Sequence, residues 1–131
     1  FGPHLCGDSL DVHNGEVLTG SWRPKDQLQI FDLGSGELIK NISWDGGLFK
    51  SRVPVSLYAS QFSKLSADMY IAGGSGSNEV KIFDRATHTP FCTISDLNRA
   101  CLSLDFSNQN SMFAAGCADG CVRLMNITKI Q

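Results

Sequence analysis

Leu28-Gln29-Ile30-Phe31-Asp32 is a short strand-like stretch that recurs twice further along the chain. The later copies are Val80-Lys81-Ile82-Phe83-Asp84 and Val122-Arg123-Leu124-Met125-Asn126, so each copy ends in an acid or an amide. A small-residue run with a glycine precedes each copy: Leu18-Thr19-Gly20-Ser21, Ile71-Ala72-Gly73-Gly74 and Ala114-Ala115-Gly116-Cys117. Further upstream lie Leu10-Asp11-Val12, Ser60-Gln61-Phe62 and Leu104-Asp105-Phe106. The same three elements in the same order indicate an internal repeat.

The period of this repeat points to its architecture. The closing residues Asp32, Asp84 and Asn126 are 52 and 42 positions apart. A period of roughly 40–45 residues with several strands per unit is typical of a β-propeller blade. A unit of this size is unable to bury its own hydrophobic faces and has to stack on its neighbours. The repeat therefore predicts a scaffold rather than a self-contained catalytic domain.

These motifs resemble the WD40-repeat family, whose blades end in a Trp-Asp pair. Phe31-Asp32 and Phe83-Asp84 stand where that pair would be, and Met125-Asn126 is a more degenerate copy. Asp119 matches the turn aspartate of the family, seven positions before the closing pair. The Gly-His dipeptide that usually opens a repeat is absent. The resemblance covers nearly the whole chain and implies a non-catalytic, cofactor-free scaffold for protein–protein interaction within a larger complex.

Alternation of apolar and polar residues, with Gly, Asn and Asp between the runs, divides the repeats into strands. The predicted fold is all-β, a partial propeller with blades at about 4–42, 54–94 and 100–127. The predicted strands are 7–12, 16–21, 27–33 and 37–42; then 54–63, 69–74, 79–85 and 91–94; then 101–107, 112–117 and 121–127. The last blade lacks an outer strand, as expected of the C-terminal end of a propeller.

Three blades are fewer than the 4–8 that a propeller needs to close. We therefore expect either further blades of a larger propeller or self-association to complete the ring. A chain without such company would expose unpaired strand edges.

Composition restricts the other classes of function. The formal net charge of −2 gives no bulk attraction to nucleic acid or to an anionic membrane, and no apolar run reaches the roughly 20 residues of a membrane span. Five cysteines without a CxxC motif indicate reduced thiols and an intracellular protein, cytoplasmic or nuclear. A disulfide or a metal at Cys117 and Cys121, which flank a tight turn, is the alternative.

The candidate partner-binding residues lie in loops on one face of the predicted propeller. The longest connections are 21–26 and about 43–53, and together they hold both tryptophans and four basic residues. Trp and Arg are enriched among interface hot spots. The candidates are Trp22, Arg23, Lys25, Trp44, Phe49, Lys50 and Arg52, with Arg99 in a shorter loop on the same face. The alternative is that Trp22 and Trp44 pack between blades and the charges are merely solvated.

A second function class uses the same basic loops to read a phosphorylated ligand, such as a phosphopeptide, a phosphoinositide or RNA. An enzyme is not expected, because no histidine accompanies a nucleophile and no phosphate-binding loop precedes a helix. His4 and Cys6 would supply only two ligands to a metal. Asp11 and Asp105 occupy equivalent repeat positions, which favours a structural role for these acids. We predict no catalytic, metal-binding or cofactor-binding residues.

Overall fold

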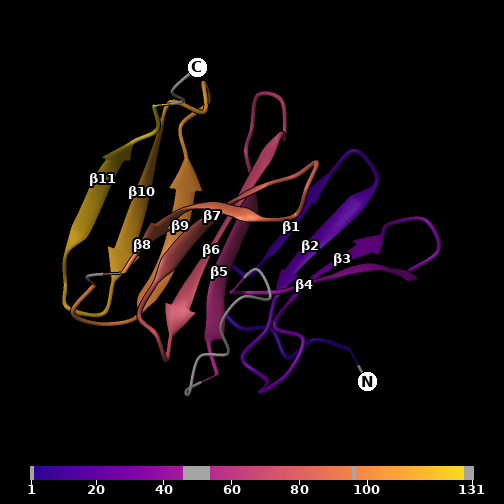
Figure 1. Cartoon of the computed structure of the whole chain (residues 1–131), viewed down its shortest axis with the longest axis horizontal. Coiled ribbons are helices and arrows are strands. Elements are labelled where there is room, and N and C mark those ends of the chain that lie inside the picture. Colours follow the sequence, from indigo (N-terminus) through magenta and orange to yellow (C-terminus); the bar gives the residue numbers. More distant parts are fainter. Residues whose placement is uncertain (1, 46–53, 96, 129–131) are drawn as a thin grey trace.

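The structure is a computed structural model that describes residues 2–45, 54–95 and 97–128. The strands in these residues pair antiparallel within each sheet. Eleven strands are present in these residues, and they form three sheets in chain order (Figure 1). Blade 1 contains β1 (Leu10–His13), β2 (Glu16–Gly20), β3 (Leu28–Asp32) and β4 (Leu38–Ile42). Blade 2 contains β5 (Ser56–Phe62), β6 (Met69–Ser75), β7 (Val80–Asp84) and β8 (Pro90–Ile94). Blade 3 contains β9 (Cys101–Phe106), β10 (Met112–Cys117) and β11 (Val122–Asn126).

One predicted boundary is wrong at the start of blade 1. The first strand was expected from residue 7, whereas β1 begins at Leu10. Asp8 forms a parallel bridge with Ala59 of blade 2 instead, and the backbone N–H of Ser60 donates to the carbonyl of Asp8 at 3.0 Å. The segment before β1 therefore pairs with the neighbouring blade, which a repeat pattern within one blade does not reveal.

The three sheets stand side by side, with the first strand of each next to the first strand of the following one (Figure 1). Because side chains alternate along a strand, each blade presents one row to the preceding blade and another to the following blade. On blade 2, Tyr70 and Phe83 face blade 1, whereas Ile71 and Ile82 face blade 3. The apolar core is therefore divided into two layers, one at each junction between blades.

Aromatic rings fill the layer between blades 1 and 2. Tyr70 and Phe83 stack with ring centroids 5.1 Å apart, and Phe62 meets Tyr70 edge-on at 6.2 Å. All three rings are buried, and full burial of a side chain of this size stabilises a fold by about 1.5–3 kcal/mol. The layer between blades 2 and 3 holds smaller side chains together with Phe106 and Phe113.

Glycine in the second strand lets adjacent blades approach closely. A Cβ atom on Gly20 would lie 3.1 Å from the Cβ of Leu57, on the first strand of blade 2. A Cβ atom on Gly73 would lie 3.1 Å from the Cβ of Cys101, on the first strand of blade 3. The glycine of the repeat thus makes room for the inner strand of the next blade.

Candidate interaction face

One edge of the sheets carries the loops that the sequence singled out. The connections β2–β3, β6–β7 and β10–β11 lie along the lower edge of Figure 1, together with the N-terminus. We call this edge the loop face. The start of the β2–β3 connection lies against the start of β5, because the N–H of Leu57 donates to the carbonyl of Ser21 at 3.0 Å.

Trp22 is a large apolar side chain that this face presents to solvent. Its side chain is 49% exposed, and its ring lies 4.7 Å from the imidazole of His4. Its backbone is held from both sides: the N–H of Trp22 donates to the carbonyl of His4 at 3.1 Å, and the Ser56 hydroxyl donates to the carbonyl of Trp22 at 3.4 Å. A fixed backbone thus supports a half-exposed indole.

Arg23 organises the β2–β3 loop from within. Its guanidinium donates to the carbonyls of Lys25 at 2.8 Å, Asp26 at 3.1 Å and Gly2 at 3.2 Å. It also donates to Oε1 of Gln29 at 2.6 Å. Four hydrogen bonds leave little of this guanidinium for a ligand. Arg23 therefore positions the loop that carries Trp22.

The remaining predicted residues fall into two groups. Lys25 and Arg99 are exposed, and their side chains have no hydrogen-bond or ion-pair partner among the described residues. Phe49, Lys50 and Arg52 lie outside the described residues. The described basic charge of the loop face that remains available to a partner therefore comes from Lys25 and Arg99.

The prediction that Trp44 is an exposed partner-binding residue is corrected by the structure, in which its side chain is buried. Its side chain is 7% exposed and belongs to the core between blades 1 and 2, where its ring lies 5.8 Å from that of Phe83. Its indole Nε1–H donates to Oε2 of Glu79 at 3.1 Å. The connection after β4 folds inward at this point, so Trp44 takes the packing role that the sequence left as an alternative.

Lys81 is a structural residue that the sequence reasoning missed. Its buried ammonium donates to the carbonyl of Trp44 at 2.9 Å and to Oδ1 of Asp45 at 3.2 Å, and it lies 5.1 Å from the indole centroid. The lysine anchors the connection between blades 1 and 2. The available signal was a lysine between Val80 and Ile82, in a strand that is otherwise apolar.

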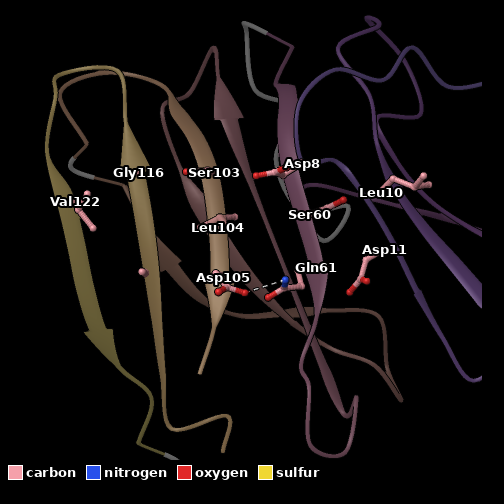
Figure 2. Close-up of a pocket in the computed structure, with 11 residues that line it drawn as sticks. Asp8, Leu10, Asp11, Ser60, Gln61, Ser103, Leu104, Asp105, Gly116 and Val122 are labelled. Carbon is pink, nitrogen blue, oxygen red and sulfur yellow. Dashed lines mark hydrogen bonds between the residues drawn. The ribbon is translucent and has the colours of Figure 1, made fainter. Parts of the chain in front are cut away.

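A second concavity opens between the inner strands. Its volume is about 510 Å³, and its acids come from different blades (Figure 2). Oδ2 of Asp11 accepts the backbone N–H of Phe62 at 2.8 Å. Oδ1 of Asp105 accepts Lys64 Nζ at 2.7 Å and Gln61 Nε2 at 3.1 Å, and the bond from Lys64 is the main cause that lowers the pKa of Asp105. Both acids are thus engaged in contacts between blades.

The thiols do not pair with one another. All five cysteines lie in the described residues and are free, including Cys117 and Cys121. Cys101 is buried against blade 2, and burial raises the pKa of its thiol to about 12. Within the described part of the chain, no group of three or more His, Cys, Asp or Glu side chains could hold a metal ion. The same residues contain no helix long and apolar enough to span a bilayer.

Comparison with known proteins identifies the architecture. The β-propeller domain of Cps50 (Swd1) from Myceliophteria thermophila superposes with a TM-score of 0.73 at 13% identity, over 98% of this chain and 37% of that one. The computationally designed Ika8 protein superposes with a TM-score of 0.67 at 19% identity, over 90% of this chain and 32% of that one. This chain thus spans about a third of either structure.

No protein-family model and no curated protein sequence matches the chain. Identities this low establish the fold alone. The similarity to known propellers and the three antiparallel sheets together show that the chain forms a partial β-propeller of three blades, as the repeat pattern predicts.

Proposed function

We propose that this chain is a non-catalytic scaffold of the WD40-repeat type that binds a protein partner through Trp22 on its loop face. The observation that carries the proposal is a half-exposed indole on a loop whose backbone is fixed by internal hydrogen bonds. Exposed tryptophans are over-represented among the residues that dominate binding energy at interfaces. Lys25 and Arg99 would form the basic rim of this surface, with Phe49, Lys50 and Arg52 as further predicted members.

Preorganisation supports the choice of this loop. A partner that binds a mobile loop has to order it, and the ordering of each side chain costs binding free energy. Arg23 has already fixed the β2–β3 loop through bonds to three carbonyls and one amide oxygen. Binding at Trp22 therefore demands little further ordering.

The closing acids of the repeat support the WD40-like assignment. In blade 1, Oδ2 of Asp32 accepts the backbone N–H of Ser35 at 2.7 Å. In blade 2, Oδ1 of Asp84 accepts the backbone N–H groups of Ala86 at 2.7 Å and Thr87 at 3.0 Å. The same residue of two repeats thus caps the turn between the third and fourth strands. A shared structural role is what a shared repeat motif implies.

The partner that suits this surface is a peptide segment with an apolar or aromatic anchor and an acidic residue. The Trp22–His4 pair offers ring surface, and Lys25 offers a charge that is free to bind. A phospho-ligand reader would rest on several cations, of which Arg23 is already occupied. An intracellular location, cytoplasmic or nuclear, stays part of this proposal on account of the free thiols.

The test compares Trp22→Ala with Leu65→Ala. Leu65 is 71% exposed in the turn after β5, at the opposite edge from the loop face, so it controls for loss of exposed apolar surface. Each variant is used as bait in quantitative affinity purification from cell extract, after circular dichroism has confirmed the fold. We expect at least one bound protein to fall roughly tenfold or more with Trp22→Ala, because hot-spot truncations cost about 2 kcal/mol or more. Leu65→Ala should retain it.

Equal partner sets for both variants would refute the proposal. The phospho-ligand alternative has a different signature, since binding carried by phosphate contacts weakens steeply as salt concentration rises. Binding that survives Trp22→Ala, falls steeply with salt and is lost in the double variant Lys25→Ala, Arg99→Ala would assign the face to a phosphorylated ligand instead.

A further inference from the structure

Two buried cysteines lie opposite each other at the loop-face end of blade 3. Cys101 begins β9 and Cys117 ends β10, and the two residues are register partners in the antiparallel pair. Directly opposed residues project to the same side of a sheet, and both thiols belong to the core between blades 2 and 3. Cys101 is 0% exposed and Cys117 is 7% exposed. Both blades that enclose these thiols are part of the described chain.

The backbone pattern at this pair brings the two side chains close together. The N–H of Cys117 donates to the carbonyl of Cys121 at 3.0 Å, and the N–H of Ala118 donates to the carbonyl of Ala100 at 2.9 Å. Cys101 and Cys117 therefore form a non-hydrogen-bonded pair, the type in which opposite side chains lie closer. Such pairs have Cβ atoms about 4.5 Å apart, and a disulfide needs about 3.5–4.5 Å. A small movement is therefore enough to join the two sulfurs.

The two thiols already interact. Burial is the main cause that raises the pKa of the Cys101 thiol to about 12, and the Cys117 thiol contributes to the rise through its charge and a hydrogen bond. Cys121, which lies across the hairpin from Cys117, is exposed. The thiol buried beside Cys117 is therefore that of Cys101.

Cys117 is the thiol that an oxidant reaches first. It is the less buried of the two, and it ends β10 at the loop face. The guanidinium of Arg123 lies near its sulfur, because Asp119 is the main cause that raises the pKa of Arg123 and Cys117 contributes as well. A cation next to a cysteine sulfur promotes its reaction as a nucleophile. Cys101, whose raised pKa keeps the thiol protonated, is suited to the second step.

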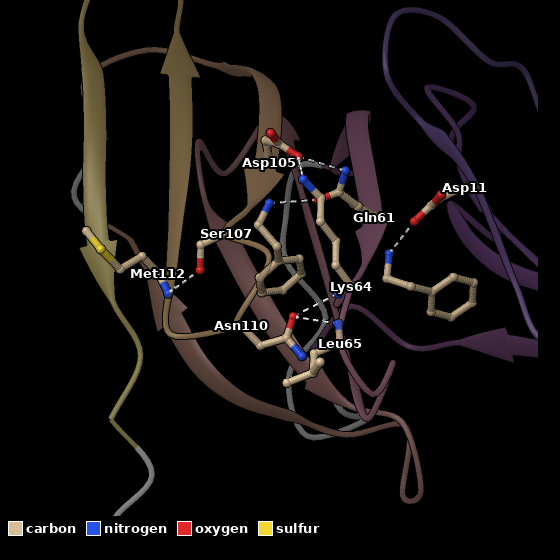
Figure 3. A network of polar contacts seen from close by, with 10 residues as sticks. Asp11, Gln61, Lys64, Leu65, Asp105, Ser107, Asn110 and Met112 are labelled. Atoms are coloured by element: carbon tan, nitrogen blue, oxygen red, sulfur yellow. Dashed lines mark hydrogen bonds and ion pairs between the residues drawn. The ribbon is translucent and has the colours of Figure 1, made fainter.

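The two ends of β9 are fixed to blade 2 in different ways. At one end, the N–H of Phe106 donates to Oε1 of Gln61 at 2.7 Å, and Nε2 of Gln61 donates to Oδ1 of Asp105 at 3.1 Å (Figure 3). At the loop-face end, the Cys101 side chain packs on Gly73, where an added Cβ atom would lie 3.1 Å from the Cys101 sulfur. A bond from Cys101 to β10 would therefore add a covalent constraint at the end of β9 where this side chain holds blade 2 by packing.

We propose that Cys101 and Cys117 form a reversible disulfide on reaction with a peroxide, and that this bond clamps β9 to β10 at the loop face. In the first step the Cys117 sulfur attacks one oxygen of hydrogen peroxide, which forms a sulfenic acid and releases water. The Cys101 sulfur then displaces the hydroxyl group from the Cys117 sulfur, and the hydroxyl leaves as water with the proton of Cys101. The two sulfurs lose two electrons, which the peroxide gains. A thiol reductant reverses the bond by exchange.

The test maps the bond after the full chain has been treated with hydrogen peroxide. Proteolysis before Asp105 and Asp119 places Cys101, Cys117 and Cys121 in three separate peptides. We expect mass spectrometry without reductant to find the Cys101 peptide joined to the Cys117 peptide, and to find the two separate after dithiothreitol. A link between Cys117 and Cys121 instead, or no link once the exposed cysteines are fully oxidised, overturns the proposal.

A variant isolates the buried pair from the other thiols. Cys6→Ser, Cys92→Ser and Cys121→Ser, combined in one chain, change only exposed cysteines and leave Cys101 and Cys117. Peroxide should lower the number of titratable thiols in the denatured variant from two to none, and dithiothreitol should restore both. The oxidised variant should run as a single chain on a non-reducing gel. Thiols that resist peroxide, or thiols lost with formation of covalent dimers, would contradict an internal bond.

Thermal unfolding of this variant tests the clamp. Cys101 and Cys117 are 16 positions apart, so a disulfide closes a loop that restricts the unfolded chain. The oxidised form should unfold about 5 °C or more above the reduced form. Adding Cys101→Ala removes the second thiol and should abolish the difference between the peroxide-treated and reduced samples. An oxidised form that unfolds at or below the temperature of the reduced form would refute the clamp.

Discussion

Blade 2 and the two end blades are built from the same repeat, but they differ in what covers them. Both faces of blade 2 are buried, one against blade 1 and the other against blade 3. Blades 1 and 3 each bury one face and leave the other in solvent. This difference shows that a single propeller repeat does not bury its own hydrophobic faces. Its hydrophobic positions are stabilising only when a neighbouring blade is present.

The largest effect on stability is expected when the equivalent aromatic residue is truncated in two different blades. Phe83 of blade 2 is fully buried against Tyr70 and Trp44, whereas Phe31, at the same repeat position in blade 1, is only half-buried. Phe83→Ala should lower the free energy of unfolding by about 3–5 kcal/mol, the usual cost of such a core truncation. Phe31→Ala should lower it by about 1 kcal/mol or less, within the range of exposed substitutions.

Urea unfolding of the two variants and of the wild-type chain measures both values. Should Phe83→Ala prevent folding, Phe83→Leu gives the same comparison at a smaller loss. Equal losses at Phe31 and Phe83 would contradict the view that coverage by a neighbour determines the stability that each position contributes.

A second pair compares the basic residue at the second position of the third strand. In blade 2, the buried Lys81 reaches the carbonyl of Trp44 and Asp45, across the junction with blade 1. In blade 3, Arg123 pairs with Asp119 of its own hairpin. Lys81→Ala should destabilise the fold by about 2 kcal/mol, because it leaves a buried carbonyl without its donor.

Arg123→Ala should produce a clearly smaller loss, because its pair is local to one hairpin. Thermal unfolding of the two variants, monitored by circular dichroism, makes the comparison. A larger loss for Arg123→Ala would mean that contacts within a blade outweigh contacts between blades.

The smallest effect is expected from the turn of blade 3, where Asp119 accepts from Arg123 Nη2 at 2.8 Å and from the backbone N–H of Cys121 at 3.1 Å. Arg123 is the main cause that lowers the pKa of Asp119 from 3.8 to about 2. Because the folded chain holds this carboxylate ionised, its contribution is fully present above about pH 4. It is lost as the pH falls from there to about 2.

Titration of the Asp119 carboxyl carbon by NMR should show the low midpoint directly. Arg123→Gln removes the charge and should return the midpoint toward the ordinary value of an aspartate. An unchanged midpoint would show that the backbone bond from Cys121, rather than the ion pair, sets the pKa of Asp119.

Much of the fold followed from local pattern. The strand β10 has the predicted bounds, and the other strands lie within three residues of theirs, because alternation and turn residues act over short distances. The candidate site was harder to predict. Trp22 and Trp44 both sit in long connections on the same edge, yet one is half-exposed and the other is buried beneath Lys81.

The difference between these tryptophans comes from partners distant in sequence. Trp44 is buried because Glu79, 35 positions later, accepts its indole N–H and because Phe83 packs on its ring. Arg23 likewise had the composition of a binding residue, but its donors are taken by loop carbonyls and by Gln29. No rule of composition or spacing specifies such contacts.

The amino-acid order by itself determined that the chain forms three successive antiparallel sheets, since hydrophobic periodicity and turn chemistry are properties of neighbouring residues. Only the tertiary structure decided which copies of the repeat are buried. Phe31 and Phe83 have the same residue on either side and the same place in a strand, but one faces solvent and the other faces a blade. Burial is a property of the packed neighbour, and for Phe83 that neighbour comes from a distant part of the chain.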